Sequence, residues 1–279
     1  MLKSLIKRKI FDPVSISSVI KVINSNNELR EIWEYSFDLF PDFSSHFAVP
    51  VYDKEIEHRI RMLVVGETFF IKKEIDGILE SKKGCSYADV GDTDGSVRLI
   101  LEEYFSKEKL SSVGINLQEN AVEKIKKRGL DAICADALSL GDMGNNYDIV
   151  SAFETIEHLP DPIGFLDRIK SVINSRLILS VPFIRHSRIS LAYLSDKWPE
   201  GKKPTIENTH IFELSPLDWK KIFLHTGWKI ENEWKLMMFP STGLSRFILQ
   251  PYWRSVSFEG FWFVSLSKYN KYASQYVVE

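Results

Sequence analysis

Short apolar runs alternate with amphipathic stretches through the middle of the chain. The strand-like runs are residues 85–90, 110–116, 131–135, 147–153 and 176–182. Between them, residues 95–106, 118–128 and 161–173 repeat apolar positions every three or four residues, which is the spacing of a helix with one buried face. This alternation is typical of a parallel sheet with helices on both faces. The pattern therefore predicts a doubly wound α/β domain.

The N-terminal part of the chain, residues 1–82, has helical spacing without strand-like runs. We expect helices over 17–23, 27–40 and 54–81, the last being one long helix or two joined near Gly66. Such a helical cap could close over a cofactor or substrate as a lid, or it could form a packing layer on one edge of the sheet.

The C-terminal part predicts one more helix and two aromatic strands. The helix is expected to begin at Ser215-Pro216 and to stop at Gly227. Residues 228–237 and 260–269 read as strands that pair as a hairpin. Residues 83–279 would then form one domain, with a mostly parallel seven-stranded sheet that ends in an antiparallel strand.

Composition and charge narrow the class of protein. The 279 residues are 44% hydrophobic, with a net charge of -2 and no basic stripe that would track a nucleic acid. We see no apolar run long enough for an integral membrane segment and expect a cytoplasmic protein. Cys85 and Cys134 fall in apolar runs and are expected to be core thiols. The six histidines lack ligand-like spacing, so we predict no metal site. Composition leaves the oligomeric state open.

The stretch from Asp89 to Gly95 reads as a glycine-bearing turn between a strand and a helix. Such a turn lets the backbone approach a ligand and aims a helix N-terminus at it. A nucleotide-type cofactor is therefore the leading hypothesis. The stretch lacks the G-x-G-x-x-G pattern of dinucleotide-binding proteins, which argues against a nicotinamide-dependent oxidoreductase, the least favoured function considered.

Several segments together resemble the class I S-adenosylmethionine-dependent methyltransferases, in the branch that includes quinone-biosynthesis O-methyltransferases. The turn resembles the acidic-x-Gly-x-Gly-x-Gly signature, with Thr93 in place of the middle glycine. Glu154 to Pro162 resembles the E-x-x-E-H-x-x-D-P segment of that branch, and residues 177–182, 208–216 and 226–228 resemble later family segments. The resemblance covers residues 83–237 and implies the Rossmann-like methyltransferase fold with S-adenosylmethionine as cofactor.

The resemblance also implies a set of cofactor-binding residues at the strand ends. They are Asp89, Gly91, Asp92, Thr93 and Gly95 in the turn, Asn116 and Leu117 on the ribose side, Asp136 and Ala137 on the adenine side, and Phe153 and Glu154 near the sulfonium. Asn116 stands where the family usually has an acid. Two alternatives need no cofactor: Asn116 could start a turn, and Asp136 could cap a helix.

Methyl transfer to a hydroxyl or protonated amine needs a base for the acceptor proton. His158 is our first candidate for this catalytic base and His210 our second, although His158 could instead be a hydrogen-bonding strut. Glu157 could orient His158 or cap a helix. Residues 183–209 and 239–259 would lie on the substrate side.

We therefore expect an enzyme that methylates a small molecule at oxygen, such as a sugar, a nucleotide-sugar or a lipid-linked precursor. The alternative is a degenerate methyltransferase fold that binds a cofactor or a protein partner without turnover.

Overall fold

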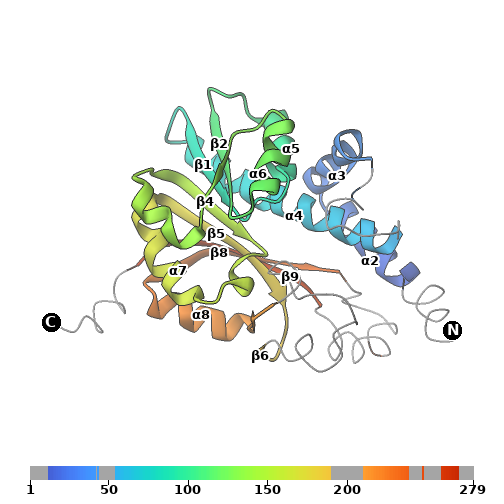
Figure 1. Cartoon of the computed structure of the whole chain (residues 1–279). Helices are drawn as coiled ribbons and strands as arrows, with labels where there is room; N and C mark the ends of the chain where they lie inside the picture. The colour runs from blue at the N-terminus through green and yellow to red at the C-terminus, as the bar shows by residue number, and fades with distance from the viewer. Residues whose placement is uncertain are drawn as a thin grey trace.

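The computed structural model describes residues 12–41, 43, 54–189, 210–238, 247 and 259–269. Its central element is a seven-stranded sheet in the order β3-β2-β1-β4-β5-β9-β8 (Figure 1). The strands of this sheet are β1 (Cys85–Val90), β2 (Leu110–Asn116), β3 (Ala132–Cys134), β4 (Tyr147–Phe153), β5 (Ile173–Phe183), β8 (Trp228–Met237) and β9 (Gly260–Lys268). A separate small pair is formed by β6 (Arg188–Ile189) and β7 (Phe212–Glu213).

Helices precede, connect and follow these strands. The α-helices are α2 (Asp12–Asn24), α3 (Asn27–Leu39), α4 (Lys54–Leu79), α5 (Ser96–Tyr104), α6 (Glu119–Lys127), α7 (Pro162–Arg168) and α8 (Pro216–His225). Short 3-10 turns are η2 (Ala137–Met143), η3 (Ile156–His158) and η4 (Ile169–Val172).

The sheet has the topology that the sequence predicts. β1 pairs in parallel with both β2 and β4, so the strand order reverses direction at β1. β9 lies antiparallel between β5 and β8, and β8 forms one edge of the sheet. The predicted doubly wound, mostly parallel seven-stranded sheet is confirmed. Ligands of such sheets bind at the carboxyl ends of the strands near the reversal point, here the ends of β1 and β4.

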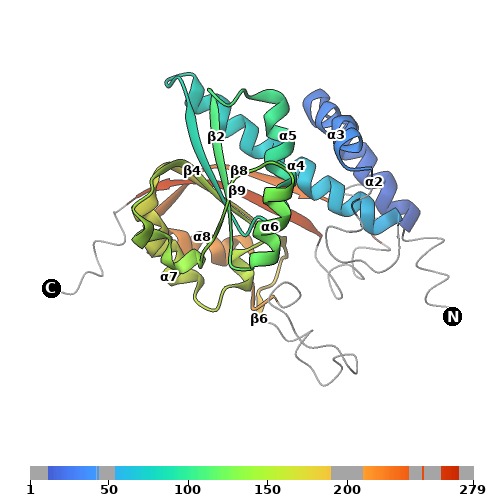
Figure 2. The same cartoon turned by 45° about the horizontal axis from the view of Figure 1, so that its top comes forward.

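Alternate residues of each strand enter two separate apolar layers. Ile149 and Ile178 pack in one layer with α2 to α5, whereas Val150, Leu177 and Leu179 pack in the other with α7 and α8. Figures 1 and 2 both show α7 and α8 across the sheet from the N-terminal helices. This division follows from the period of two along a strand, because both faces of a central sheet are covered.

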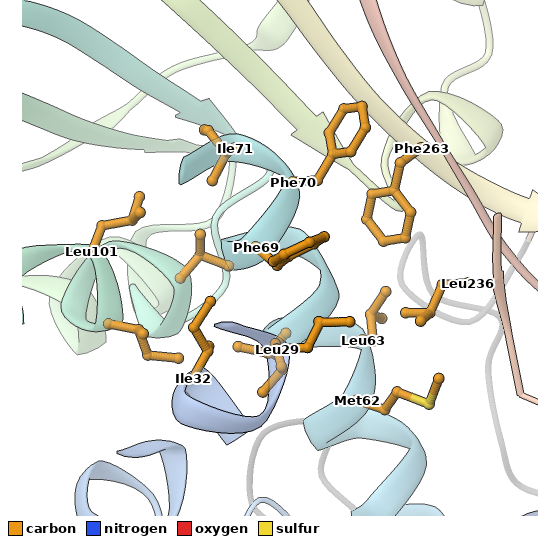
Figure 3. Close-up of a cluster of buried hydrophobic side chains, with 14 of the residues drawn as sticks. Leu29, Ile32, Met62, Leu63, Phe69, Phe70, Ile71, Leu101, Leu236 and Phe263 are labelled. Atoms are coloured by element: carbon orange, nitrogen blue, oxygen red, sulfur yellow. The ribbon is translucent and has the colours of Figure 1, made fainter. Parts of the chain in front are cut away.

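α4 is one continuous helix that lies close against the sheet. A Cβ on Gly66 would stand 2.5 Å from Leu236 Cδ2, so glycine lets the helix approach β8 closely. Figure 3 shows Leu63 and Phe70 of α4 facing Leu236 and Phe263 of the C-terminal strands. An apolar core shared by α4 and the C-terminal strands therefore joins α4 to the sheet.

Two local predictions need correction. The helix expected over 161–173 ends as α7 at Arg168, continues as η4, and gives way to β5 at Ile173, because its apolar residues suit a buried strand equally well. The start is as predicted: Asp161 caps the helix by accepting a hydrogen bond from the N–H of Gly164 at 2.8 Å. Cys85 is buried, but Cys134 is exposed because β3 lies at the edge of the sheet.

Most of the two predicted substrate-side segments, residues 190–209 and 239–258 except Phe247, lies outside the described residues.

Candidate cofactor and catalytic site

The turn between β1 and α5 is held in shape by its own carboxylates. The Asp92 carboxylate accepts hydrogen bonds from the N–H groups of Asp94 and Gly95 at 3.2 and 2.6 Å, and Asp94 accepts one from the N–H of Ser96 at 3.0 Å. Asp92 Oδ2 also lies 2.8 Å from Nε of the buried Arg98. Such charge-assisted bonds are stronger than neutral ones. Asp92 and Asp94 therefore stabilise the turn itself.

The backbone conformation at positions 91 and 95, and the lack of space for a side chain there, both require glycine. Their φ angles are +85° and +77°, a region that residues with a side chain rarely adopt. A Cβ on Gly91 would lie 2.3 Å from Thr155 Oγ1. Thr93, which stands where the family has its middle glycine, does not have a positive φ, so the turn accommodates threonine without this strain.

A cavity of about 90 Å³ lies at this turn. The turn forms one wall, Phe153 and Glu154 at the end of β4 form another, and Leu63, Val64 and Glu67 of α4 cover it. The structure thus brings together the sequence candidates from β4 and from the turn, except Gly95, which is not a lining residue, and it adds Glu67. Because ligand pockets usually enclose about 300–1,000 Å³, this cavity suits one part of a nucleoside cofactor.

A larger hollow of about 820 Å³ lies elsewhere, between the N-terminal helices and β8. Ser175 and Arg176, near the amino end of β5, contribute to its lining. The smaller cavity is the candidate cofactor site, here called the cofactor cavity, because parallel sheets bind ligands at the opposite, carboxyl end of their strands.

The cofactor cavity has an acidic lining. Burial, and then the charge of Asp92, raises the pKa of Asp89 to about 8, and the hydroxyl of Ser151 donates to Asp89 Oδ1 at 2.6 Å. Burial also raises the pKa of Glu67 well above its usual range, and the charges of Asp89, Asp92, Glu157 and Asp94 add to this effect. Carboxyl groups this close together favour a bound cation, which would hold them in the ionised form.

The candidates at the ends of β2 and β3 lie outside this cavity. Asn116 Nδ2 donates to the carbonyl of Asp92 at 2.8 Å, while Asn116 Oδ1 accepts from the N–H of Gln118 at 2.8 Å. Asp136 is exposed and accepts from the N–H of Leu138 at 2.9 Å, as a cap of η2. Asn116 therefore forms the turn, and Asp136 the helix cap, that the sequence offered as alternatives to cofactor binding. Leu117 presents a 57% exposed side chain, and Ala137, which begins η2, is half-buried.

The segment after β4 begins with a strained residue. Glu154 has a φ of +44° and is the one non-glycine residue with a positive φ in the described part of the chain. Its N–H donates to Ser180 Oγ at 3.0 Å, and Ser180 Oγ donates to Glu154 Oε1 at 3.1 Å. Strain of this kind persists where the surroundings hold it, often at functional sites.

His158 and His210 meet beside this segment. Their rings make an edge-to-face contact with centroids 4.6 Å apart, and Glu157 Oε1 lies 4.0 Å from His158 Nε2. The N–H of Ile211 donates to the carbonyl of Glu157 at 2.8 Å, which ties the two segments together. Sequence alone placed both histidines as candidates, but their contact depends on segments about fifty residues apart.

Carboxylates surround the His210 ring. Its Nδ1 lies 3.0 Å from Glu213 Oε1. Burial alone would lower the pKa of His210, but the hydrogen bond that Glu213 accepts and the charge of Glu157 raise it. Burial raises the pKa of Glu157 to about 7, against the effect of His210. The arrangement can hold a proton or a cation between two histidines and a buried acid.

Several solved structures with this fold are methyltransferases. The magnesium protoporphyrin IX methyltransferase of Synechocystis PCC 6803 with bound S-adenosylmethionine is 16% identical, with a TM-score of 0.51 over 87% of this chain and 98% of that chain. The same enzyme with bound S-adenosylhomocysteine is 17% identical, with a TM-score of 0.50 over 78% and 89%. A proposed sarcosine dimethylglycine methyltransferase from Galdieria sulphuraria is 12% identical, with a TM-score of 0.52 over 79% and 91%. At these identities the likeness shows the fold.

The fold and the glycine turn define the class I S-adenosylmethionine-dependent methyltransferases. A family model described as a methyltransferase domain matches residues 70–233, more than half of the chain, and the chain belongs to this family. The predicted family, the enzyme class and S-adenosylmethionine as the cofactor of that class are confirmed. A comparison with curated protein sequences found no match. Within the described ranges, every helix is too short or too polar to cross a bilayer.

Proposed function

We propose that this chain transfers a methyl group from S-adenosylmethionine to an oxygen atom of a small-molecule acceptor. The observation that carries the proposal is the acid-lined cavity between the Gly91 turn and Glu67 of α4. S-Adenosylmethionine supplies an electrophilic methyl group on a sulfonium, and its amino-acid end carries an ammonium. Both positive charges suit the carboxyl groups of this cavity.

Glu67 is the residue best suited to recognise that charge. It is 6% exposed and lines the cavity, and its carboxylate has no hydrogen-bond or ion-pair partner among the described residues. A buried carboxylate without a partner costs several kcal/mol if it stays ionised, so a cationic ligand would stabilise it. The adenosine end would then extend toward Leu117 and Asp136, at the ends of β2 and β3.

Transfer to a hydroxyl also requires a proton acceptor beside the methyl group. Glu154 forms a wall of the cavity, and His158 and His210 lie in the segments next to it. Imidazole and a buried carboxylate with a raised pKa both take up protons near neutral pH. These groups favour an acceptor hydroxyl, such as that of a sugar, a nucleotide-sugar or a lipid-linked precursor.

Replacement of Glu67 by glutamine tests the cofactor site. Two opposite charges about 4 Å apart interact by about 4 kcal/mol at an effective dielectric constant of 20, and solvent and protonation reduce this energy. We expect Glu67→Gln to weaken S-adenosylmethionine binding about tenfold, or ~1.4 kcal/mol, in calorimetric titrations. S-Adenosylhomocysteine, which lacks the sulfonium charge, should lose less affinity.

The matched control is Glu74→Gln, which removes the same charge from α4 outside the cavity, where Glu74 accepts from Asn232 at 2.7 Å. Equal losses for both ligands in Glu67→Gln, or equal losses in both variants, would contradict a role for Glu67 in recognising the sulfonium.

Cofactor affinity should also depend on pH. Burial raises the pKa of Glu67, so part of the free protein carries a protonated Glu67 that must ionise when a cation binds. Affinity for S-adenosylmethionine should therefore rise with pH and level off above the pKa of the free protein. Titrations in buffers with different ionisation enthalpies would detect the released proton.

The alternative function is a cofactor-binding protein without turnover. It is favoured by Asn116 and Asp136, whose side chains already bond to neighbouring backbone. Binding of S-adenosylmethionine without methyl transfer to any hydroxyl acceptor in a broad screen would support this alternative.

A further inference from the structure

Three side chains outside the cofactor cavity converge on one point. Glu157 and His158 belong to η3, which begins three residues after the end of β4, and His210 lies two residues before the start of β7. One possible ligand atom from each of these three residues lies within 4.8 Å of the other two. This separation is suited to a single ion placed between them, since oxygen and nitrogen ligands bind divalent metals at about 2.0–2.2 Å.

The carboxylate of this cluster is buried and unsatisfied. Glu157 is 0% exposed, and neither of its oxygens has a hydrogen-bond partner in the described part of the structure. A buried carboxylate is normally hydrogen-bonded, ion-paired or bound to a metal. The nearby imidazole of His158, 4.0 Å away, is too distant for a hydrogen bond. The neighbouring Glu154 carboxyl interacts with Glu157 but carries no positive charge, so no hydrogen-bonded cation offsets the burial of Glu157 among the described residues.

A second carboxylate fixes the orientation of one histidine. His210 Nδ1 is bonded to Glu213 Oε1 at 3.0 Å, and Glu213 is itself buried and paired with Arg188. With Nδ1 engaged in this way, Nε2 is the ring nitrogen that can serve as a metal ligand. Histidine ligands of metals usually have such a carboxylate or carbonyl partner on the other nitrogen, which sets the tautomer and the ring orientation.

We propose that Glu157, His158 and His210 bind one divalent first-row metal ion, such as Mn²⁺ or Zn²⁺, beside the methyl-transfer site. Two imidazoles and one carboxylate form a ligand set that such ions accept with coordination positions left open. The proposal rests on the proposed function and deepens it, because an open position would bind the acceptor hydroxyl. It assigns both histidines as ligands rather than as bases.

The position of the cluster suits this role. Glu154, three residues before Glu157, is a wall of the cofactor cavity, so the cluster lies next to that cavity. The metal ion would withdraw charge from the acceptor oxygen, whose proton passes to the Glu154 carboxylate and then to water. The oxygen lone pair forms the new O–CH₃ bond, and the S–CH₃ electron pair returns to sulfur. The products are the methyl ether and neutral S-adenosylhomocysteine.

Metal binding by the full chain can be measured without an acceptor. We would strip the protein with a chelator, remove the chelator, and titrate Mn²⁺ by calorimetry and by electron paramagnetic resonance, with Zn²⁺ in parallel. The expected result is one saturable site. Glu157→Gln, which keeps the shape of the side chain, and His210→Gln should each weaken Mn²⁺ binding by at least about tenfold.

Glu213→Gln tests the orienting carboxylate separately, and we expect it to weaken metal binding by about 10–100-fold. Glu231→Gln is the control for adventitious surface binding, because Glu231 lies on β8 and contacts Lys229 and Ser267. Circular dichroism would establish that each variant is folded. If Glu157→Gln fails to fold, His210→Gln and Glu213→Gln still decide the question.

The result that would overturn the proposal is a folded wild-type chain that binds neither metal, or that binds metal equally well in Glu157→Gln, His210→Gln and Glu231→Gln. Titration of S-adenosylmethionine into the same samples separates the two proposals. Cofactor binding without metal binding refutes the metal site alone, whereas metal binding without cofactor binding refutes the proposed function.

Discussion

Replacement of Gly91 by alanine perturbs the cofactor turn at its most restricted position. The φ of Gly91 is +85°, and the new Cβ would lie 2.3 Å from Thr155 Oγ1 and 3.2 Å from Thr155 Cγ2. Gly129 provides a matched control, because its φ is +82° and a Cβ there would meet no atom within 4 Å. The two substitutions share the backbone strain and differ in the steric contact.

The magnitudes follow from these contacts. An alanine in the left-handed region costs about 1–2 kcal/mol, so Gly129→Ala should lower the free energy of unfolding by that amount. In Gly91→Ala, Thr155 must also move, which breaks its hydroxyl hydrogen bond to the carbonyl of Phe153 at 2.8 Å. A hydrogen bond contributes about 0.5–1.5 kcal/mol, and local crowding adds about 1 kcal/mol or more. We therefore expect a total loss of roughly 3–4 kcal/mol for Gly91→Ala.

Urea unfolding followed by tryptophan fluorescence would measure these differences. Thr155→Ala removes the side chain that the new methyl group meets, so Gly91→Ala in that background should cost only about as much as Gly129→Ala. Binding of S-adenosylmethionine should weaken in Gly91→Ala and stay unchanged in Gly129→Ala. The reasoning is refuted if Gly91→Ala and Gly129→Ala are equally destabilising, or if Thr155→Ala gives no relief.

Two further predictions concern pH. Burial and the charge of Asp92 raise the pKa of Asp89 to about 8, so the folded chain holds a proton that the unfolded chain releases near pH 4. The Asp89 contribution to stability should therefore fall as pH rises from about 4 to 8, and Asp89→Asn should flatten the pH dependence of urea unfolding over that range; an unchanged slope would contradict this. Burial would raise the pKa of Asp148, but Lys82 and the N–H and hydroxyl of Ser86 lower it overall. The stabilisation by Asp148 is thus present above about pH 4 and lost as pH falls through the lowered pKa. Asp148→Asn should therefore make the melting temperature less sensitive to acid. Equal acid sensitivity of the variant and the wild-type chain would contradict a stabilising interaction between Asp148 and Lys82.

The fold could be predicted because its signals are local. The apolar runs of β1, β2 and β4 are short and bounded by turn residues, and their ends match the structure. The caps Asp161 and Ser215 each accept the expected hydrogen bond from a backbone N–H three residues later. Ile173 fits both the three-to-four-residue apolar spacing of a helix and the apolar run of a buried strand, so the sequence could not decide between the two at this position.

The site was less accessible to sequence reasoning because its contacts are tertiary. Glu67 is one polar residue in an apolar helix, and only the packing of α4 over the turn places its carboxylate in the cavity. His210 meets Glu157 through a contact that no spacing along the chain encodes. The role of the sequence candidates in binding or catalysis stays a prediction. The same holds for the expected absence of a metal, which the geometry of Glu157, His158 and His210 argues against.

The most direct test of the central claim is a calorimetric titration of the full chain with S-adenosylmethionine, with a nicotinamide cofactor as control. The cavity at the Gly91 turn predicts saturable one-site binding of S-adenosylmethionine, stronger at higher pH, and no heat from the nicotinamide cofactor. A folded protein that gives no heat with S-adenosylmethionine at any pH, or that binds the nicotinamide cofactor instead, would contradict the claim.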